Sequence, residues 1–352
     1  MLLAVLLPAT ALAAPLEDML DTAPLTQELP EEAAELLEGV SPTASPGEGP
    51  LRRLAEAALE RAEAEVSAVC RTAGILLLVC VFVSLSESFA LDRRGPPYVV
   101  FAGVAVIGAA SISDLDSFLR LGLDSLASLT DYSRVLLPVL AAASAASGAV
   151  GGAAAKYGAT ALMMDVLLTA GRSAVAPCIC AYAALSLAGA AVGNEVLTAA
   201  KKLMKSVCTV LLSGICMAFT AWLALTGVVA AAADTLTARV TKTAVSAALP
   251  VVGGILSDAA GSLSAAAGVM RSSIGVFGLL AVLGICLGSL TALGVRYLVY
   301  KLSAAVCSCV TDKRLGELVR DMGTCFGLML SLNGAGALML FISIYSLMRT
   351  VL

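Results

Sequence analysis

The sequence predicts an all-α, polytopic integral membrane protein with about seven spanning helices, together with re-entrant or interfacial helices and an N-terminal signal peptide. Of its 352 residues, 59% are hydrophobic and only 14% are charged. A soluble domain carries about 25% charged residues. The mean hydropathy is +0.94, and apolar runs of spanning length recur from residue 72 onward.

The first 71 residues divide into three segments. Residues 1–13 form an apolar run that ends in Ala-Leu-Ala; this pattern is typical of a signal peptide, and an uncleaved anchor is the alternative. Residues 14–50 are acidic and rich in Pro, so we expect an extracytoplasmic linker. Residues 51–71 place Leu and Ala at helical spacing opposite Arg and Glu, which predicts an amphipathic extracytoplasmic helix. The polytopic transmembrane domain then occupies 72–352.

The transmembrane domain contains seven apolar segments that are long enough, or nearly long enough, to cross a bilayer. The expected spans lie at about 72–91, 98–113, 135–155, 174–193, 207–232, 274–298 and 323–347. The charged residues between them predict the orientation of each loop, because Lys and Arg accumulate on the cytoplasmic side.

The basic residues lead to a conflict in the middle of the chain. Arg93 and Arg94 predict a cytoplasmic first turn, and the acidic segment 114–134 then fits an outside loop. Lys156 and Lys201 both favour the cytoplasm, yet one span cannot join two cytoplasmic ends. We therefore expect 157–193 to form a re-entrant or broken helix that lines the protein interior.

The segment 241–272 is a second expected exception to simple spanning. It is less apolar than the spans, and it contains Pro250, the pair Gly253 and Gly254, and Asp258. The orientation of the loops around it requires that it stay on, or dip from, the extracytoplasmic side. We therefore expect an interfacial or re-entrant element.

Several function classes are disfavoured by composition. The chain has no His, so it has neither a Ser-His or Cys-His nucleophile nor an H-E-x-x-H zinc site. The ten Cys lie mostly in apolar runs and are expected to be packing residues. Residues 1–69 hold 13 of the 26 acidic residues and three of the 22 basic ones, a balance that does not suggest nucleic-acid binding. We expect no enzymatic activity, no cofactor, no metal and no nucleic-acid partner, with membrane lipids as the surroundings.

Ionisable residues within apolar segments form the first group of candidate functional positions, because charges at membrane depth are costly. Asp165 and Arg172 are seven residues apart, hence on one face of a continuous helix where they are able to pair. Glu87 lies near the end of the first span. The alternative for Glu87 and Arg172 is snorkelling of the side chain to the interface.

Small residues form the second group, as candidate helix-packing or conduit-lining positions. Several recur at four- or seven-residue intervals. Gly284 and Gly288 form a GxxxG pattern, which lets helix backbones approach closely in lipid. The alternative is the general abundance of Ala and Gly in this sequence. The group comprises Gly253, Gly254, Ser257, Asp258, Gly261, Gly268, Gly284 and Gly288.

Two longer blocks carry a family resemblance. "ALPVVGGILSDAAGSL" (248–263) and "YKLSAAVCSCVTDKRLGELVRDMG" (300–323) resemble segments of the stage III sporulation protein AE family. The order of signal peptide, short extracytoplasmic helical region and about seven spans is also similar to that family. The resemblance covers essentially the whole mature chain, and its motifs are structural, with no catalytic signature.

The resemblance implies a place in a multi-protein assembly. Members of the family lie in the mother-cell membrane that surrounds the forespore. Their partners are a secretion-type ATPase, other membrane proteins and ring-forming extracytoplasmic subunits, which together form a channel between the two cells. The alternative from the sequence is a stand-alone transporter for small molecules or ions, although such proteins usually show internal repeats, and none is clear here. An intramembrane enzyme is disfavoured by the absence of His.

Overall fold

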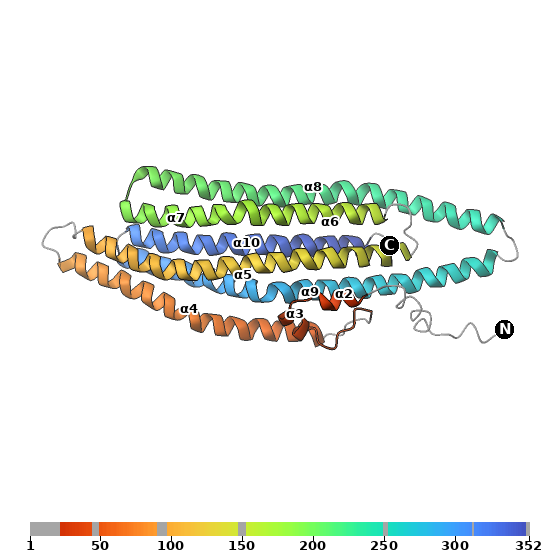
Figure 1. Ribbon diagram of the computed structural model, residues 1–352, viewed down its shortest axis with the longest axis horizontal. Coiled ribbons are helices and arrows are strands. Elements are labelled where there is room, and N and C mark those ends of the chain that lie inside the picture. The colour runs from red at the N-terminus through yellow and green to blue at the C-terminus, as the bar shows by residue number, and fades with distance from the viewer. Residues whose placement is uncertain are drawn as a thin grey trace.

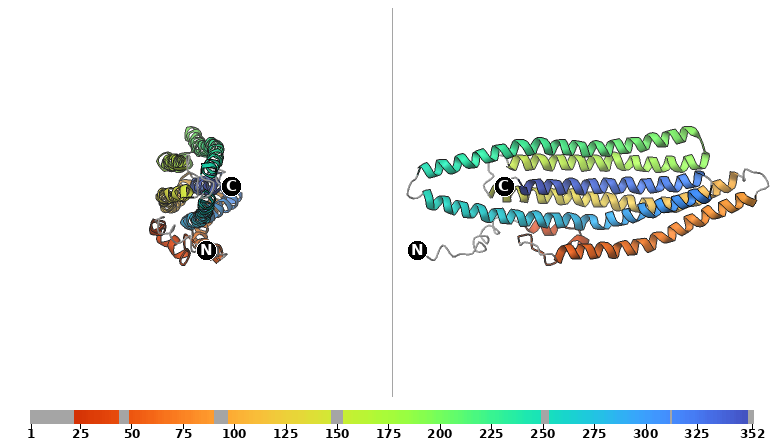
Figure 2. Two further views of the ribbon diagram at one scale, coloured as in Figure 1. Left: turned by 90° about the vertical axis from the view of Figure 1, so that its right-hand side faces the viewer. Right: turned by 180° about the vertical axis from the view of Figure 1, so that it is seen from behind.

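The computed structural model describes the protein as helices joined by short connections (Figures 1 and 2). The described residues are 22–43, 49–89, 97–146, 153–248, 253–311 and 313–349. Within them, the side chains outside the description are those of 87–88, 97, 144–146, 153–158, 223, 226–248, 253–268, 270–271, 346–347 and 349. The proposed signal peptide at 1–13 therefore lies outside the described residues.

Long helices lie side by side in an elongated, antiparallel bundle (Figure 1). Two short helices, α2 (Ala23–Gln27) and α3 (Glu31–Leu36), precede the bundle. The long helices are α4 (Gly49–Phe89), α5 (Pro97–Ala146), α6 (Ala153–Ala170), which continues through the π-helical turn η1 (Gly171–Val175) into α7 (Ala176–Val192), then α8 (Glu195–Ala248), α9 (Gly253–Val310) and α10 (Lys313–Arg349).

The all-α, membrane-spanning fold class is confirmed, with a lower number of spans than expected. Six helical stretches within the described chain are long and apolar enough to cross a membrane. The prediction of two separate spans at 98–113 and 135–155 is wrong, because 98–113 and the described first part of 135–155, up to Ala146, belong to the single helix α5. The segment 114–134 is helical and does not form an outside loop. Its charges pair along the helix at i,i+3 and i,i+4, as between Asp116 and Arg120 at 3.0 Å.

The predicted re-entrant element at 157–193 is also absent. α6, η1 and α7 form one continuous 34-residue span from Ala159 to Val192. Pro177 at the start of α7 explains the π-helical turn before it, since proline lacks an N–H and its ring crowds the carbonyl four residues earlier. Because α5 makes only one crossing, the start of α6 at Lys156 lies at the opposite end of the bundle from Lys201. This removes the conflict between the two loops.

The segment 241–272 belongs to helices in the structure. α8 continues to Ala248 and α9 begins at Gly253, so most of this segment extends two neighbouring antiparallel helices. The candidate spans on either side of it end at Trp222 and begin at Ser272, so the expectation that this segment does not cross the bilayer itself stays a prediction that the structure does not contradict. The side chains from 226 to 268 lie outside the described ones.

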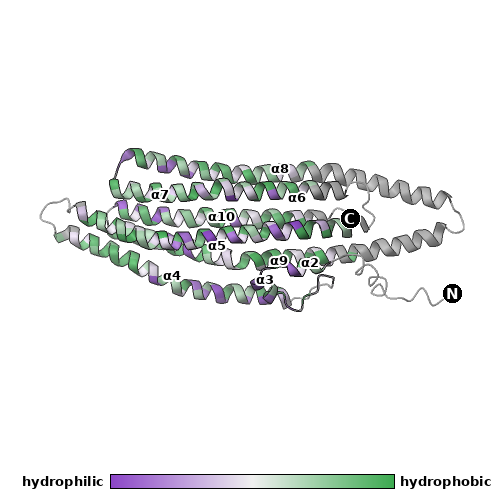
Figure 3. Ribbon diagram, in the orientation of Figure 1, coloured by the Kyte–Doolittle hydropathy of each residue, from purple (hydrophilic) through white to green (hydrophobic). Residues whose placement is uncertain are grey.

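The outer helices expose apolar surface, as expected for contact with lipid or with other membrane proteins. In the most apolar 18-residue stretch of α9 and of α10, 56% of the residues are buried, against 17% for α8. On α8, Leu203, Val210, Met217 and Leu225 are each at least 65% exposed. The colouring in Figure 3 shows apolar residues along the second half of α4, and more polar residues in the first half of α4 and toward the middle of α5. α9 and α10 therefore form the centre of the bundle.

Candidate functional site

A partly buried carboxylate on α10 joins three helices. Asp321 accepts a hydrogen bond of 2.8 Å from the phenol of Tyr182 on α7 and one of 2.6 Å from the ammonium group of Lys201 on α8. The side chains of Lys201 and Asp321 are each only 14% exposed. Because charges removed from water are stable only when paired and hydrogen-bonded, this contact fixes α7, α8 and α10 relative to one another.

A second set of polar contacts joins α4, α5 and α9. The guanidinium of Arg296 on α9 lies 3.1 Å from the carboxylate of Glu65 on α4 and 3.5 Å from the centre of the Phe118 ring on α5. Tyr300, one turn further along α9, donates a hydrogen bond of 3.1 Å to Asp114 on α5. Arg296 is buried, and its charge is therefore stabilised by an ion pair and by the face of an aromatic ring.

The two sets meet on adjacent turns of α10. Tyr300 packs against Phe326, with 4.9 Å between ring centres, and a methyl group added at Gly323 would lie 3.1 Å from its Cβ atom. Gly323 is two residues from Asp321. We refer to the combined set as the polar layer; it comprises Glu65, Asp114, Tyr182, Lys201, Arg296, Tyr300 and Asp321. It draws on each of the six spanning stretches, and its contacts join neighbouring helices across adjacent turns.

A cavity of about 610 Å³ opens beside the polar layer between α8 and α10. We call it the basic cavity. Six cationic and two anionic side chains line it, together with Tyr182 and Thr198; the charged ones are Lys201, Lys202, Lys205, Lys313, Arg314, Arg320, Glu317 and Asp321. It lies at the end of the bundle where α7 meets α8 and where α9 meets α10 (Figure 1). The abundance of Lys and Arg predicts that this end faces the cytoplasm.

A glycine allows Arg314 to reach this end of α7. Gly193 caps α7 in the left-handed conformation, with φ of 69°. The guanidinium of Arg314 packs so close to it that a Cβ atom at residue 193 would lie 2.6 Å from the guanidinium carbon. Glycine is therefore required at Gly193 for two independent reasons, the backbone conformation and the close approach of the arginine.

The structure separates the predicted pair of Asp165 and Arg172. Asp165 on α6 pairs instead with Arg134 on α5 at 2.5 Å, and Arg134 also contacts Asp131 at 3.2 Å. Arg172 is exposed in the π-helical turn η1, which interrupts the α-helical register that the prediction assumed. The side chain of Glu87, near the end of α4, lies outside the described ones.

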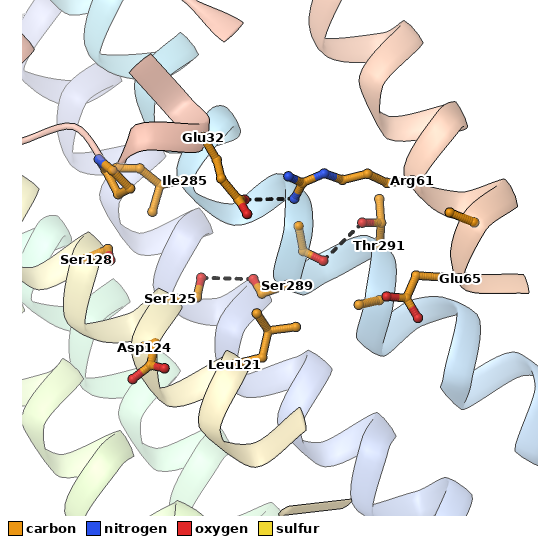
Figure 4. Close-up of a pocket in the computed structure, with 14 residues that line it drawn as sticks. Glu32, Arg61, Glu65, Leu121, Asp124, Ser125, Ser128, Ile285, Ser289 and Thr291 are labelled. Atoms are coloured by element: carbon orange, nitrogen blue, oxygen red, sulfur yellow. Dashed lines mark hydrogen bonds and ion pairs between the residues drawn. The ribbon is translucent and has the colours of Figure 1, made fainter. Parts of the chain in front are cut away.

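The predicted GxxxG positions lie where other segments approach α9. A Cβ atom at Gly284 would be 3.2 Å from the Cβ atom of Ala33 on α3, and one at Gly288 would collide with the guanidinium of Arg61 on α4. Arg61 in turn pairs with Glu32 of α3 at 2.9 Å. Both residues line a cavity of about 400 Å³, and Figure 4 shows the pair among the lining side chains. The structure thus places these two glycines at contacts with the N-terminal helices.

The remaining candidates of this group fall in the first turns of α9. Their backbone is helical, and their side-chain surroundings lie outside the described residues, as does any packing around the glycine backbones. They are Gly253, Gly254, Ser257, Asp258, Gly261 and Gly268.

None of the seven residues of the polar layer was among the candidates from sequence. Sequence patterns place Asp114 in a loop and make Lys201 a marker of orientation. The sequence does hold one signal for this part of the polar layer. Arg296 and Tyr300 stand four residues apart, and hence on one face of the helix, next to a long apolar run. Their partners come from distant segments and carry no local pattern.

The chemistry of the site is that of ion pairing and anion attraction. Among the described residues, no group of three His, Cys, Asp or Glu side chains is placed to hold a metal ion. All ten Cys are free thiols, with no disulfide. The polar layer offers fixed, paired charges, whereas the basic cavity offers cationic groups in excess of carboxylates.

Six stretches that are long and apolar enough to span a membrane, joined by partly buried polar contacts, define a polytopic helical membrane protein. The model of a protein family, stage III sporulation protein AE, matches residues 48–350, which are most of the chain. The chain therefore belongs to the stage III sporulation protein AE family. No curated protein and no solved structure matches it significantly.

Proposed function

We propose that this sporulation protein is a non-enzymatic membrane subunit of a channel or secretion-type apparatus that links mother cell and forespore and is needed for forespore development. Its partners would be a secretion-type ATPase and ring-forming extracytoplasmic proteins. Its location would be the mother-cell membrane around the forespore. Membership of the stage III sporulation protein AE family supports the sporulation part of this proposal, and the resemblance described above suggests the partners.

The length of the helices is the observation that carries the proposal of a scaffold subunit. α5 has 50 residues, so at 1.5 Å per residue it is about 75 Å long, whereas the hydrocarbon core of a bilayer is about 30 Å thick. α4, with 41 residues, exceeds the same thickness. A bundle that extends beyond the bilayer presents a rigid surface to proteins on its aqueous side.

The stand-alone transporter remains the competing function. Secondary transporters bind their substrate near the bilayer midplane, between repeats that move relative to each other. In this bundle, the buried charges pair across helices, as in Lys201 with Asp321 and Arg296 with Glu65. Those pairs hold neighbouring helices together, which favours a static subunit.

Purification from sporulating cells tests the proposal. A tagged full-length protein, extracted in mild detergent, is expected to bring down an ATPase and ring-forming extracytoplasmic proteins, identified by mass spectrometry. The matched control is the same protein expressed in vegetative cells, where those partners should be missing. Recovery of the protein alone from sporulating cells, combined with substrate flux through liposomes that contain only this protein, would favour the transporter.

A further inference from the structure

We propose that the basic cavity binds a phosphate group, carried either by the headgroup of an anionic phospholipid or by a soluble phosphate compound. This proposal does not depend on the channel role. It rests on the geometry of two helix faces, on the balance of charge between them, and on the position of the cavity at the cytoplasmic end of the bundle.

The cavity is built from two facing helical stripes. On α8, Thr198, Lys201 and Lys205 recur at intervals of three and four residues, which places them on one face of the helix. On α10, the same interval places Lys313, Glu317 and Arg320 toward the same space. The cations therefore converge on one volume of about 610 Å³ from two separate helices.

The charges in the cavity are not balanced internally. Lys201 and Asp321 neutralise each other at 2.6 Å. Within the part of the chain that the structure describes, Lys202, Lys205 and Lys313 are exposed and form no ion pair with a carboxylate. An anion that enters the cavity gains these cations without having to break an existing pair, so binding costs little rearrangement.

The start of α10 adds a further contribution for an anion. α10 begins at Lys313, and the first backbone N–H groups of a helix have no partner within the helix. Together with the helix dipole they attract phosphate. A long helix that opens at the rim of a cationic cavity is consistent with recognition of a phosphate in preference to a cation or a neutral group.

The position suits a lipid headgroup as well as a soluble ligand. Basic cavities between transmembrane helices on the cytoplasmic side commonly hold anionic headgroups. A lipid would also place its acyl chains against the apolar outer surface of the bundle, which on α8 includes Leu203 and Val210, each more than 60% exposed and on the opposite side of the helix from Lys201 and Lys205. A soluble phosphate compound would use the same cations without acyl chains, and the two sources are therefore separable by experiment.

Binding to the detergent-purified full-length protein tests the proposal. The probes are phosphatidylglycerol, phosphatidylcholine as the neutral lipid, and inorganic phosphate, each titrated while the midpoint of thermal unfolding is followed. The test variant is Lys202→Gln/Lys205→Gln/Lys313→Gln. The matched control, Arg71→Gln/Arg172→Gln/Lys301→Gln, removes the same charge from exposed positions outside the cavity.

The wild-type protein and the control are expected to be stabilised by phosphatidylglycerol or by inorganic phosphate. Each cation near an anionic surface contributes about a factor of five in affinity, so the test variant should bind about 100-fold more weakly. Stabilisation by the lipid alone identifies a headgroup as the ligand, and stabilisation by inorganic phosphate at equal strength identifies a soluble source. If the triple variant does not fold, Lys205→Gln alone should weaken binding about fivefold.

Three results would overturn the proposal. The first is that neither anionic probe shifts the unfolding midpoint of the wild-type protein. The second is that the control triple variant loses binding as strongly as the test variant, which would indicate a general effect of surface charge. The third is that an acidic peptide such as polyglutamate binds while both phosphate probes do not.

Discussion

Asp321 on α10 accepts hydrogen bonds from Tyr182 on α7 and from Lys201 on α8, at 2.8 Å and 2.6 Å. These partners stand 139 and 120 residues away in the sequence. A single carboxylate thus joins three helices at the inner rim of the basic cavity. The stability of this end of the bundle should depend on that one group more than on any of the exposed ion pairs.

Replacement of Asp321 by Asn should destabilise the protein by about 3 kcal/mol, because it leaves the charge of Lys201 partly buried without its partner. Tyr182→Phe, which removes only one neutral donor, should cost about 1 kcal/mol. Unfolding of the detergent-purified variants by denaturant measures both. A Lys201→Met/Asp321→Leu variant should recover most of the lost free energy of unfolding. If the losses of the two single substitutions instead add up in the double variant, the two charges are not coupled.

Replacement of Gly193 by Ala should lower stability by about 1–2 kcal/mol, since the left-handed backbone disfavours a Cβ atom and the Cβ atom would meet the guanidinium of Arg314. The control is Gly294→Ala on α9, where no atom lies within 4 Å of the added Cβ atom. That substitution should be neutral or stabilise the helix by up to about 1 kcal/mol. The midpoint of thermal unfolding should therefore fall for Gly193→Ala, and it should stay unchanged or rise for Gly294→Ala.

Replacement of Asp165 by Asn should change stability by less than about 1 kcal/mol, because the pair with Arg134 is largely exposed and Asp131 remains as a second partner. If this intramembrane carboxylate lines a conduit, the same substitution should lower the yield of spores while the protein level stays normal. Spore counts and immunoblots from the same cultures measure both. A normal spore yield would reduce Asp165 to a tolerated surface residue, and Asp116→Asn, in the exposed pair with Arg120, is the control.

Replacement of Gly261 by Leu is expected to reduce recovery of the assembled complex, since its small-residue row is predicted to allow close helix approach. Gly294→Leu provides a control on the same helix α9 at an open position. Co-purification of the tagged variants from sporulating cells gives the yield of partners. Equal recovery with both variants would show that the row at Gly261 is a result of composition alone.

The orientation of the bundle is tested by epitope insertion. In protoplasts of vegetative cells that express the protein, epitopes after Asn194 and after Thr311 should be reached by antibody only once the membrane is permeabilised, because both connections lie at the basic end. An epitope after Ser41, which precedes the start of α4, should lie on the extracytoplasmic side. Labelling of the Asn194 epitope before the membrane is permeabilised would show that the orientation is the opposite one and that the basic cavity lies outside the cytoplasm.

Local patterns were sufficient for the fold class. High hydropathy and long apolar runs require a membrane protein whose backbone groups are satisfied within helices. The same patterns misjudged α5, because Asp114, Asp116 and Asp131 were taken as loop residues. A helix tolerates such charges when they pair along its own face or with a neighbouring helix, as Asp131 does with Arg134 and Asp114 with Tyr300.

The sequence alone determined that this chain is an apolar, all-α membrane protein that resembles one sporulation family, because hydropathy and family motifs are local properties of a chain. Tertiary structure alone decided which charges are partners. Asp165 meets Arg134 and not Arg172, and Asp321 meets Lys201. Such pairings depend on how helices far apart in sequence pack against one another, and no spacing within a single helix encodes them.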